Sequence, residues 1–298
     1  MSAPPDLAET APASSGDLAR LRAELDRLDD ALQDLLIERA HAVARVAAFG
    51  GKGRVALRPG REAAIIRRLL ARHSGPLAPQ ALVRIWRELL AGTTAMQGPH
   101  RIAVCDARAG CGLTRIAHEH FGALTPLAVF AHPADALAEA RSGEASAAVL
   151  PLPSDAEPAA DAWWPGLLRE PETGQSELRV VARLPFWRPR PEGAPAEEAF
   201  VVSPVAPDPS GQDRSLVGIE AAPDLSRERL RDVLARAGLF PAAMLLRLDG
   251  GAGAEVRALI EVDGFMGDND PRLAGAGAEL RSLRVIGAYA VPVGEDAA

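Results

Sequence analysis

The first residues able to do chemistry are two arginines in the N-terminal part of the chain. In residues 15–49 an apolar stripe at helical spacing continues into Arg39, and Arg22 lies beside the same face. A charged group on an apolar face is costly to bury unless it is used. Because the arginine fork matches a carboxylate, these positions indicate binding of an anion. For either residue alone, an interfacial salt bridge is the alternative.

Two further predicted helices carry polar groups at one of their ends. Arg61 and Glu62 precede the apolar face of the second helix by one turn. Thr93 and Gln97 continue the apolar stripe of the third helix. Taken together with the two arginines, they predict a pocket for a small polyanion inside a three-helix core. Helix-end solvation is the alternative for each residue taken singly.

The helix that holds the first arginines is predicted to run from Ser15 to Phe49. Its leucines alternate three and four residues apart, which lays a continuous stripe on one face. The glycine-rich run GGKG at 50–53 ends it. A helix of this length is expected to pack along another long helix, including one from a second copy of the chain. The leucines of the stripe are Leu18, Leu21, Leu25, Leu28, Leu32 and Leu35.

The second and third helices are shorter. Residues 59–72 have an inner face of isoleucines and leucines, and residues 79–97 begin with a proline, which suits a first helical turn. Residues up to about 98 are therefore predicted to be all-helical.

Composition excludes several classes of protein. The chain has 298 residues, of which 48% are hydrophobic and 24% charged, so a mostly disordered protein is excluded. Charged residues interrupt every long apolar run, so we expect no membrane-spanning helix. The 40 acidic residues outnumber the 33 basic ones and give a net charge of −7, which argues against general nucleic-acid binding. The acidic start, residues 1–9, has no secretory pattern, and two cysteines, Cys105 and Cys111, fit a reducing cytosol.

The character of the sequence changes after residue 100. Strands alternate with helices over residues 101–154, which predicts a small parallel α/β unit. Residues 155–214 are rich in proline, and only LRVVARL and AFVVSPV read as strands. Residues 215–293 follow the order βαββαβ, which predicts a split-βαβ sandwich of ferredoxin-like type.

Residues 17–98 resemble the all-helical class of bacterial chorismate mutases. The stretches that carry the resemblance are LRAELDRLDDALQDLLIERA, RPGREAAIIRRLLAR and LVRIWRELLAGTTAMQ. Members of that family are intertwined dimers in which the first-helix arginine reaches into the partner's active site. The resemblance implies as catalytic residues Arg39, Gln97 and Lys52, and as substrate-binding residues Arg22, Arg61, Glu62 and Thr93.

This sequence departs from the family in two places. The register of the essential lysine falls on Gly50, and Lys52, the chain's only lysine, follows two residues later in the glycine-rich bend. An acidic residue commonly stands three before the Arg-Glu pair, where this chain has Arg58.

The implied reaction is the rearrangement of chorismate to prephenate in aromatic amino acid biosynthesis. It is unimolecular and pericyclic, so the resemblance implies no cofactor and no metal. The enzyme must hold the compact reactive conformer and stabilise the charge that develops across the breaking ether bond. The arginines would pair with the carboxylates of chorismate. Glu62 would accept from the ring hydroxyl, and Gln97 and Lys52 would donate to the ether oxygen.

The remainder is similar, in order and spacing, to the dehydratase part of bifunctional chorismate mutase–prephenate dehydratases. RIAVCDARAGCGLTRIAHEHFG and GEASAAVLPLPS carry that similarity, and the C-terminal segment resembles an ACT-type regulatory domain. The dehydratase motif Thr-Arg-Phe is absent, and the Glu-Ser-Arg-Pro motif for phenylalanine is replaced by residues 246–249, LRLD. These departures indicate a degenerate dehydratase module.

The expected fold is multidomain: a three-helix, all-α mutase domain forming an intertwined homodimer, a reduced α/β lobe, and an α+β ferredoxin-like, ACT-type domain. A cytosolic chorismate mutase is the first hypothesis, with neither nucleic acid nor membrane as a partner. A bifunctional mutase–dehydratase and a non-catalytic ligand-sensing or interaction protein are the alternatives. The predicted bounds are 1–14 for a disordered N-terminus, 15–98 for the mutase domain, 99–154 for the α/β lobe, 155–214 for a Pro-rich connector and 215–293 for the ACT-like domain.

Other candidate groups are weaker. His118 and His120 flank Glu119, but residues two apart on a helix point to different faces, so a solvated surface is favoured over a metal site. The arginines Arg67, Arg68 and Arg72 are expected to form a solvated helix face.

Overall fold

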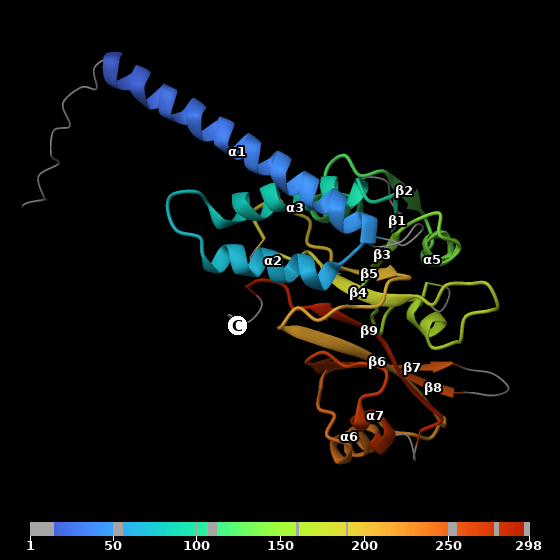
Figure 1. The fold of residues 1–298 in the computed structure, drawn as a ribbon. Helices are drawn as coiled ribbons and strands as arrows, with labels where there is room; N and C mark the ends of the chain where they lie inside the picture. Colours follow the sequence, from blue (N-terminus) through green and yellow to red (C-terminus); the bar gives the residue numbers. More distant parts are fainter. Residues whose placement is uncertain are drawn as a thin grey trace, which may run out of the picture. The chain divides into compact units, whose positions relative to one another are not determined.

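The computed structural model describes residues 15–49, 56–98, 100–106, 112–158, 161–188, 190–249, 255–276 and 280–294. The chain divides into two units, Met1–Lys52 and Gly53–Ala298 (Figure 1). The predicted disordered start at 1–14 and the GGKG bend lie outside the described residues. The three helices predicted for residues 15–98 belong to different units, the first helix to the first unit and the other two to the second.

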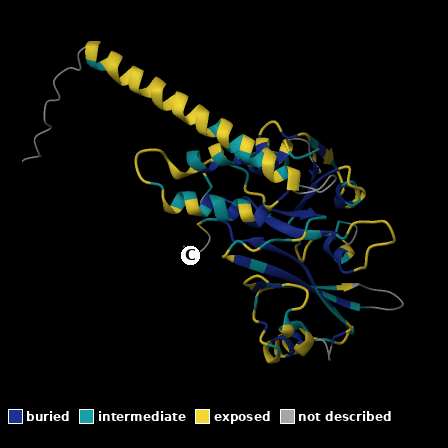
Figure 2. Ribbon diagram, viewed as in Figure 1, coloured by how far each residue is buried: buried dark blue, intermediate teal, exposed yellow. Residues whose placement is uncertain are grey.

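Helix α1 (Ser15–Phe49) is the described part of the first unit, with the bounds that its leucine spacing predicts. None of its residues is buried. The exposed fraction along the leucine stripe runs from 47% at Leu18 to 61% at Leu35, and Figure 2 shows the helix as exposed or intermediate throughout. A continuous apolar face open to water is typical of a surface that another element covers.

Helices α2 (Pro59–Ala71) and α3 (Pro79–Ala95) form a hairpin in the second unit. Each begins with a proline, which has no N–H to leave unpaired in the first turn. Buried residues of both helices, among them Ile66 and Leu90, pack with Phe186 and Ala290 in one core. The hairpin therefore shares its core with the sheet that follows it in the chain.

Among the described residues of the second unit, nine strands form one sheet in the order β2-β1-β3-β5-β4-β9-β6-β8-β7 (Figure 1). The parallel end confirms the predicted α/β alternation. Its elements are β1 (Ile102–Cys105), α4 (Gly112–Phe121), β2 (Leu127–Phe130), α5 (Pro133–Ser142) and β3 (Ala147–Pro151).

Two cores lie on opposite faces of this parallel end, because successive side chains of a strand point to opposite faces. Ile102 and Val104 of β1 belong to the core that includes α4. Ala103 and Cys105 belong to the core that includes α5 and the short helix η1 (Trp164–Leu167). Strands β1 and β3 are buried over nearly their whole length, which matches their unbroken apolar sequences, whereas β2 at the edge is only partly buried.

The two strands predicted in the Pro-rich segment lie in the middle of the sheet. They are β4 (Arg179–Leu184) and β5 (Ala199–Ser203), which pair antiparallel with each other, while β5 also pairs with β3. The tryptophans of this segment, Trp163 and Trp164, are buried in the core beside α5.

The C-terminal part has the predicted order βαββαβ. Its four strands pair antiparallel in the order β9-β6-β8-β7, with α6 and α7 packed against the same core. The elements are β6 (Asp213–Ala221), α6 (Arg227–Arg236), β7 (Pro241–Asp249), β8 (Glu255–Asp263), α7 (Pro271–Ala276) and β9 (Ser282–Ala290).

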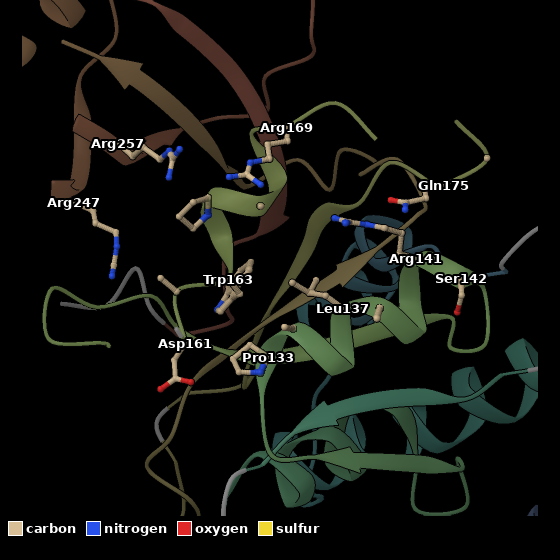
Figure 3. A pocket seen from close by; sticks show the side chains of 16 residues that line it. Pro133, Leu137, Arg141, Ser142, Asp161, Trp163, Arg169, Gln175, Arg247 and Arg257 are labelled. Carbon is tan, nitrogen blue, oxygen red and sulfur yellow. The ribbon is translucent and has the colours of Figure 1, made fainter. Parts of the chain in front are cut away.

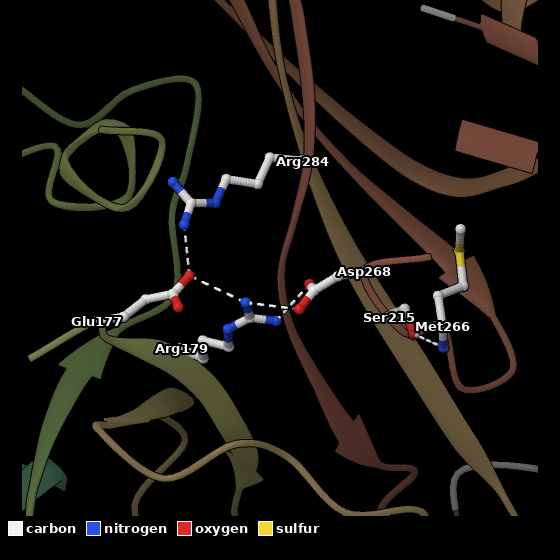
Figure 4. Close-up of polar contacts among 6 residues, drawn as sticks. All are labelled: Glu177, Arg179, Ser215, Met266, Asp268 and Arg284. Carbon is white, nitrogen blue, oxygen red and sulfur yellow. Dashed lines mark hydrogen bonds and ion pairs between the residues drawn. The ribbon is translucent and has the colours of Figure 1, made fainter. Parts of the chain in front are cut away.

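The two halves of the sheet join where β4 pairs in parallel with β9, at Val180 and Gly287. A Cβ atom at position 287 would lie 2.3 Å from the carbonyl oxygen of Val180, so only glycine allows this approach. Ion pairs surround the junction (Figure 4): Arg179 donates from Nη1 and Nη2 to Asp268 at 2.6 and 2.9 Å. Glu177 accepts from Arg179 and from Arg284 of β9.

None of the helices in the described part of the chain is long and apolar enough to cross a membrane.

Candidate active site

The residues predicted for the site lie in both units. Arg22 is exposed on α1, and Arg39 is partly buried on the same helix, beside Leu35 and Ala42. Lys52 lies outside the described residues, so its predicted role stays a prediction. The remaining candidates belong to the α2–α3 hairpin.

The first turn of α2 is capped by an aspartate from far along the chain. Asp208 accepts from the backbone nitrogens of Gly60 and Arg61, at 3.0 and 3.2 Å. Its Oδ2 atom also accepts from Nε of Arg58 at 3.2 Å. A carboxylate at this place satisfies helix N–H groups that have no partner within the helix and favours the positive end of its dipole. The Arg61-Glu62 pair is therefore held by a residue outside the three helices.

Glu62 forms a buried ion pair with Arg87 of α3. Nη1 of Arg87 donates to Oε2 of Glu62 at 3.0 Å, and the two side chains are only 4% and 14% exposed, respectively. Burial raises the pKa of Glu62, and the positive charge of Arg87 opposes that rise. The guanidinium of Arg87 also lies over the ring of Phe186, 4.9 Å from its centroid, an arrangement in which the ring face attracts the cation.

Thr93 and Gln97 extend the face of α3 as predicted. Thr93 is buried, and its hydroxyl donates to the carbonyl oxygens of Leu89 and Leu90, at 2.9 and 3.0 Å. Nε2 of Gln97 donates to the carbonyl oxygen of Thr93 at 3.2 Å. Both side chains thus bond to their own helix, and a ligand would have to exchange these bonds for its own.

The hairpin brings two predicted pairs to the same end. Arg61 and Glu62 stand in the first turn of α2, whereas Thr93 and Gln97 stand at the close of α3. Glu62 contacts Arg87, which lies between one and two turns before Thr93 along α3. That end offers a carboxylate, a hydroxyl, an amide and a guanidinium. This set can bind and orient a polar ring compound.

Sequence reasoning missed Arg87 and Asp208. A signal for Arg87 was present, because it stands between Val83 and Leu90 at helical spacing, on an apolar stripe. No local signal points to Asp208, which reaches α2 only through the tertiary fold. Arg67 corrects an expectation: it is half-buried rather than solvated, and its Nη1 donates to Oγ of Ser210 at 2.8 Å.

The histidines also correct the sequence analysis. His120 is 8% exposed, not solvated, and its ring contacts Phe121 edge-on. Burial lowers its pKa well below the usual value, and the charges of Arg87 and His100 lower it further. No group of three or more His, Cys, Asp or Glu able to hold a metal ion occurs among the residues that the structure describes. Cys105 is buried, which raises its pKa to about 11, with smaller effects from nearby aspartates.

Comparison with known families assigns the helical part of the chain. Residues 21–98 match the family Chorismate mutase type II, a range that includes every predicted site residue. The chain therefore carries a chorismate mutase type II domain at residues 21–98.

The curated relatives are named as bifunctional enzymes. The bifunctional chorismate mutase/prephenate dehydratase of Pseudomonas aeruginosa is 27% identical over 180 residues, which is 58% of this chain and 49% of the relative. The enzyme of the same name from Neisseria gonorrhoeae is 33% identical over 101 residues, 34% of this chain and 27% of the relative. The chain thus resembles bifunctional mutase/dehydratases and spans at most about half the length of these relatives.

Solved structures give a more distant likeness. GqqA, described as a novel type of quorum quenching acylase, is 15% identical with a TM-score of 0.49, over 65% of this chain and 96% of that one. A prephenate dehydratase from Arthrobacter aurescens in complex with L-Phe is 16% identical with a TM-score of 0.47, over 64% and 90%. At these values the likeness carries no information on function.

Proposed function

We propose that this protein is a chorismate mutase, an isomerase that rearranges chorismate to prephenate in the biosynthesis of phenylalanine and tyrosine. The family match over residues 21–98 carries the proposal. The shared end of the α2–α3 hairpin supports it, because Arg61-Glu62 and Thr93-Gln97 are the pairs that the resemblance assigns to the substrate.

The proposed mechanism is conformational and electrostatic. Arg22, Arg39 and Arg61 bind the two carboxylates and nearby oxygens of chorismate, which restrains it in the compact reactive conformer. Gln97 and Lys52 donate to the ether oxygen, where negative charge develops as the C–O bond breaks. Neither a covalent intermediate nor an obligatory proton transfer takes part.

The buried ion pair suggests how Glu62 can serve this reaction. Its Oε2 atom accepts from Arg87, and we assign its other oxygen, Oε1, to the ring hydroxyl of chorismate. Arg87 is then a positioning residue that fixes the carboxylate, and its positive charge opposes the rise in the pKa of Glu62 that burial causes. Asp208 acts in the same way on the backbone of the Arg61-Glu62 turn.

The exposed leucine stripe of α1 supports a homodimer. A second copy that lays its own α1 along this face would bury six leucines that are 47–61% exposed in the single chain. In the proposed dimer Arg22 completes the site of the partner subunit. The cytosolic location that the cysteine content favours, and the ferredoxin-like, ACT-type nature of the C-terminal elements, belong to the same proposal.

The names of the relatives favour a second candidate function, prephenate dehydratase activity. The absence of a Thr-Arg-Phe tripeptide argues against it. Both functions are tested by incubating the protein with chorismate, following the loss of its ultraviolet absorbance, and assaying prephenate and phenylpyruvate separately. Prephenate alone is the expected product, phenylpyruvate would establish the second activity, and unconsumed chorismate would refute the mutase.

Variants make that assay specific. Arg39→Ala should abolish turnover while the helical circular dichroism is retained, whereas Arg68→Ala, an exposed residue of α2, should leave turnover unchanged. Lys52→Ala should cause a large loss if the shifted lysine donates to the ether oxygen. Near-normal turnover by Arg39→Ala would refute the assignment of the pocket.

A further inference from the structure

A polar cavity is lined by residues between 133 and 257, which follow the α2–α3 hairpin in the chain. It has a volume of about 600 Å³ and is lined by α5, by η1 and the residues around it, and by the strands β7 and β8 (Figure 3). Pockets for small ligands typically measure about 300–1,000 Å³. Four arginines line it, in a protein of net charge −7. Those arginines are Arg141, Arg169, Arg247 and Arg257.

Two of these arginines are direct cross-strand partners. Arg247 of β7 pairs in register with Arg257 of β8, and both side chains line the cavity. They lie on the sheet face opposite to α6 and α7, since their neighbours Leu245 and Leu259 belong to the core beside η1. Like charges directly opposite each other on one face destabilise a sheet. A cross-strand arginine pair therefore requires negative charge nearby, from protein carboxylates, from a ligand or from both.

The other two arginines approach from the helical side. Arg141 stands in the last turn of α5, and Arg169 follows η1 with its side chain exposed. In Figure 3 the guanidinium of Arg169 points toward that of Arg257, from the opposite side of the cavity. The buried Nε atom of Arg141 has no hydrogen-bond partner among the described residues. Guanidinium groups thus converge from two separate structural elements.

Carboxylates of the protein contact the two strand arginines. Arg247 lies 4.0 Å from Glu157, and Arg257 contacts Glu220 and Glu255, at 3.3 and 3.6 Å. Of these, none lines the cavity, where Asp161 is the acidic residue. The carboxylates therefore hold the strand arginines in place, and the lining itself carries four arginines and one aspartate.

The rest of the lining fits an organic body between the charged ends. Leu137, Trp163 and Pro165 supply apolar surface, and Ser142 and Gln175 supply groups able to hydrogen-bond. The indole nitrogen of Trp163 donates to the carbonyl oxygen of Pro151 at 2.9 Å, which fixes its ring. A rigid apolar wall between two arginine pairs suits a compact molecule with an acidic group at each end.

We propose that this cavity binds a small organic dianion, whose two carboxylate or phosphate groups are taken by Arg247 with Arg257 and by Arg169 with Arg141. The proposal goes beyond the mutase function and does not rest on it. Paired guanidinium groups bind such oxyanions by bidentate, charge-assisted hydrogen bonds, and a cavity of one charge raises the local concentration of the opposite charge.

Calorimetry with benzene-1,3-dicarboxylate, a ring with two carboxylates, tests the proposal on the full chain. The titration uses the Arg39→Ala variant, so that the mutase arginine does not contribute. We expect the dicarboxylate to bind at least about tenfold more tightly than benzoate, the matched monoanion, because one charged contact pair is lost with benzoate. Succinate and inorganic phosphate, as further arms, distinguish carboxylate from phosphate preference.

Variants locate the binding. Arg169→Gln and Arg247→Gln, each in the Arg39→Ala background, should weaken the dicarboxylate by about tenfold or more. Arg231→Gln, an exposed arginine on α6, should have no effect. Arg169 is exposed, so its variant should fold normally.

Absence of millimolar binding by every dianion, or binding that survives both pocket variants, would overturn the proposal. In otherwise unaltered protein Arg169→Gln should leave chorismate turnover unchanged, so failure here is distinguishable from failure of the mutase proposal.

Discussion

The Oδ1 atom of Asp208 lies 3.0 Å from the backbone nitrogen of Gly60, although 148 residues separate them in the chain. The segment between β5 and β6 thereby caps helix α2, whose first turn holds the Arg61-Glu62 pair. Gly60 is required for this contact, since a Cβ there would lie 1.9 Å from the carbonyl oxygen of Asp208. Where related mutases have an acidic residue before the pair, this chain has Arg58, and that arginine binds Asp208. The negative charge is thus restored from a distant part of the sequence.

Asp208→Ala should therefore affect both stability and catalysis. Loss of a helix cap lowers the free energy of unfolding by about 1–2 kcal/mol, and the loosened first turn should lower chorismate turnover through Arg61 and Glu62. Urea unfolding and the chorismate assay measure the two effects. Asp224→Ala, an exposed aspartate in the turn before α6, is the control. Equal behaviour of the two variants would show that the cap has no such role.

The ion pair of Arg87 with Glu62 gives a second prediction. Arg87→Met leaves the Glu62 carboxylate buried without its partner, which typically costs about 3–5 kcal/mol of unfolding free energy. The double variant Glu62→Gln/Arg87→Met removes both charges and should recover much of that loss. Urea unfolding of the two single variants and the double variant measures the coupling.

Arg84→Met is the matched control, since Arg84 is an exposed arginine of the same helix. If Arg87→Met cost no more than this control, the pair would be dispensable for folding. Chorismate turnover of the double variant tests the role of Glu62 in the site, because this variant should fold yet remain impaired.

Local sequence patterns were enough for the elements. Leucine spacing predicted α1 and the GGKG run predicted its end, while proline and glycine positions predicted α2 and the start of α3. The order of the C-terminal elements also followed from alternation and turn residues. Each of these features is determined by residues within a few positions of one another.

The tertiary partners could not be predicted in this way. Thr93 and Gln97 were found because their neighbours on α3 are apolar, and the same rule would have found Arg87. The carboxylate that meets Arg87 lies on another helix, and the one that caps α2 follows β5. The pairing of β4 with β9 likewise depends on residues more than a hundred positions apart. The periodicity of a sequence does not reveal such contacts, because they arise from tertiary packing.

His120 predicts a pH dependence of stability. Burial holds its pKa well below 6.5 in the folded state, and the unfolded chain takes up the proton near 6.5. The unfolded state therefore binds more protons between these two values, and stability falls as the pH drops below about 6.5. The slope approaches about 1.4 kcal/mol per pH unit for one such histidine. Burial also lowers the pKa of His100, which adds in the same direction.

Urea unfolding at several pH values from about 5 to 8, the range in which histidine changes its charge, measures this slope. His120→Gln should reduce this slope by the contribution of one proton, up to about 1.4 kcal/mol per pH unit, because glutamine does not titrate. His41→Gln, exposed on α1, is the control. An unchanged slope in His120→Gln would contradict the prediction.

The junction at Gly287 decides whether the two halves of the sheet unfold together. Gly287→Ala places a Cβ atom against the carbonyl oxygen of Val180, and such overpacking typically costs about 1–3 kcal/mol. Gly267→Ala is the control, since a Cβ there meets no atom within 4 Å. Tryptophan fluorescence reports on Trp86, Trp163, Trp164 and Trp187, all of which precede β6 in the chain, whereas far-ultraviolet circular dichroism reports on the whole chain. We expect the two urea transitions to coincide in the Gly267→Ala control. In Gly287→Ala they should separate, because the variant breaks the strand pair that couples the α5 core to the βαββαβ elements. A destabilised Gly287→Ala whose transitions still coincide would mean that the ion pairs of Arg179 are sufficient to hold the halves together.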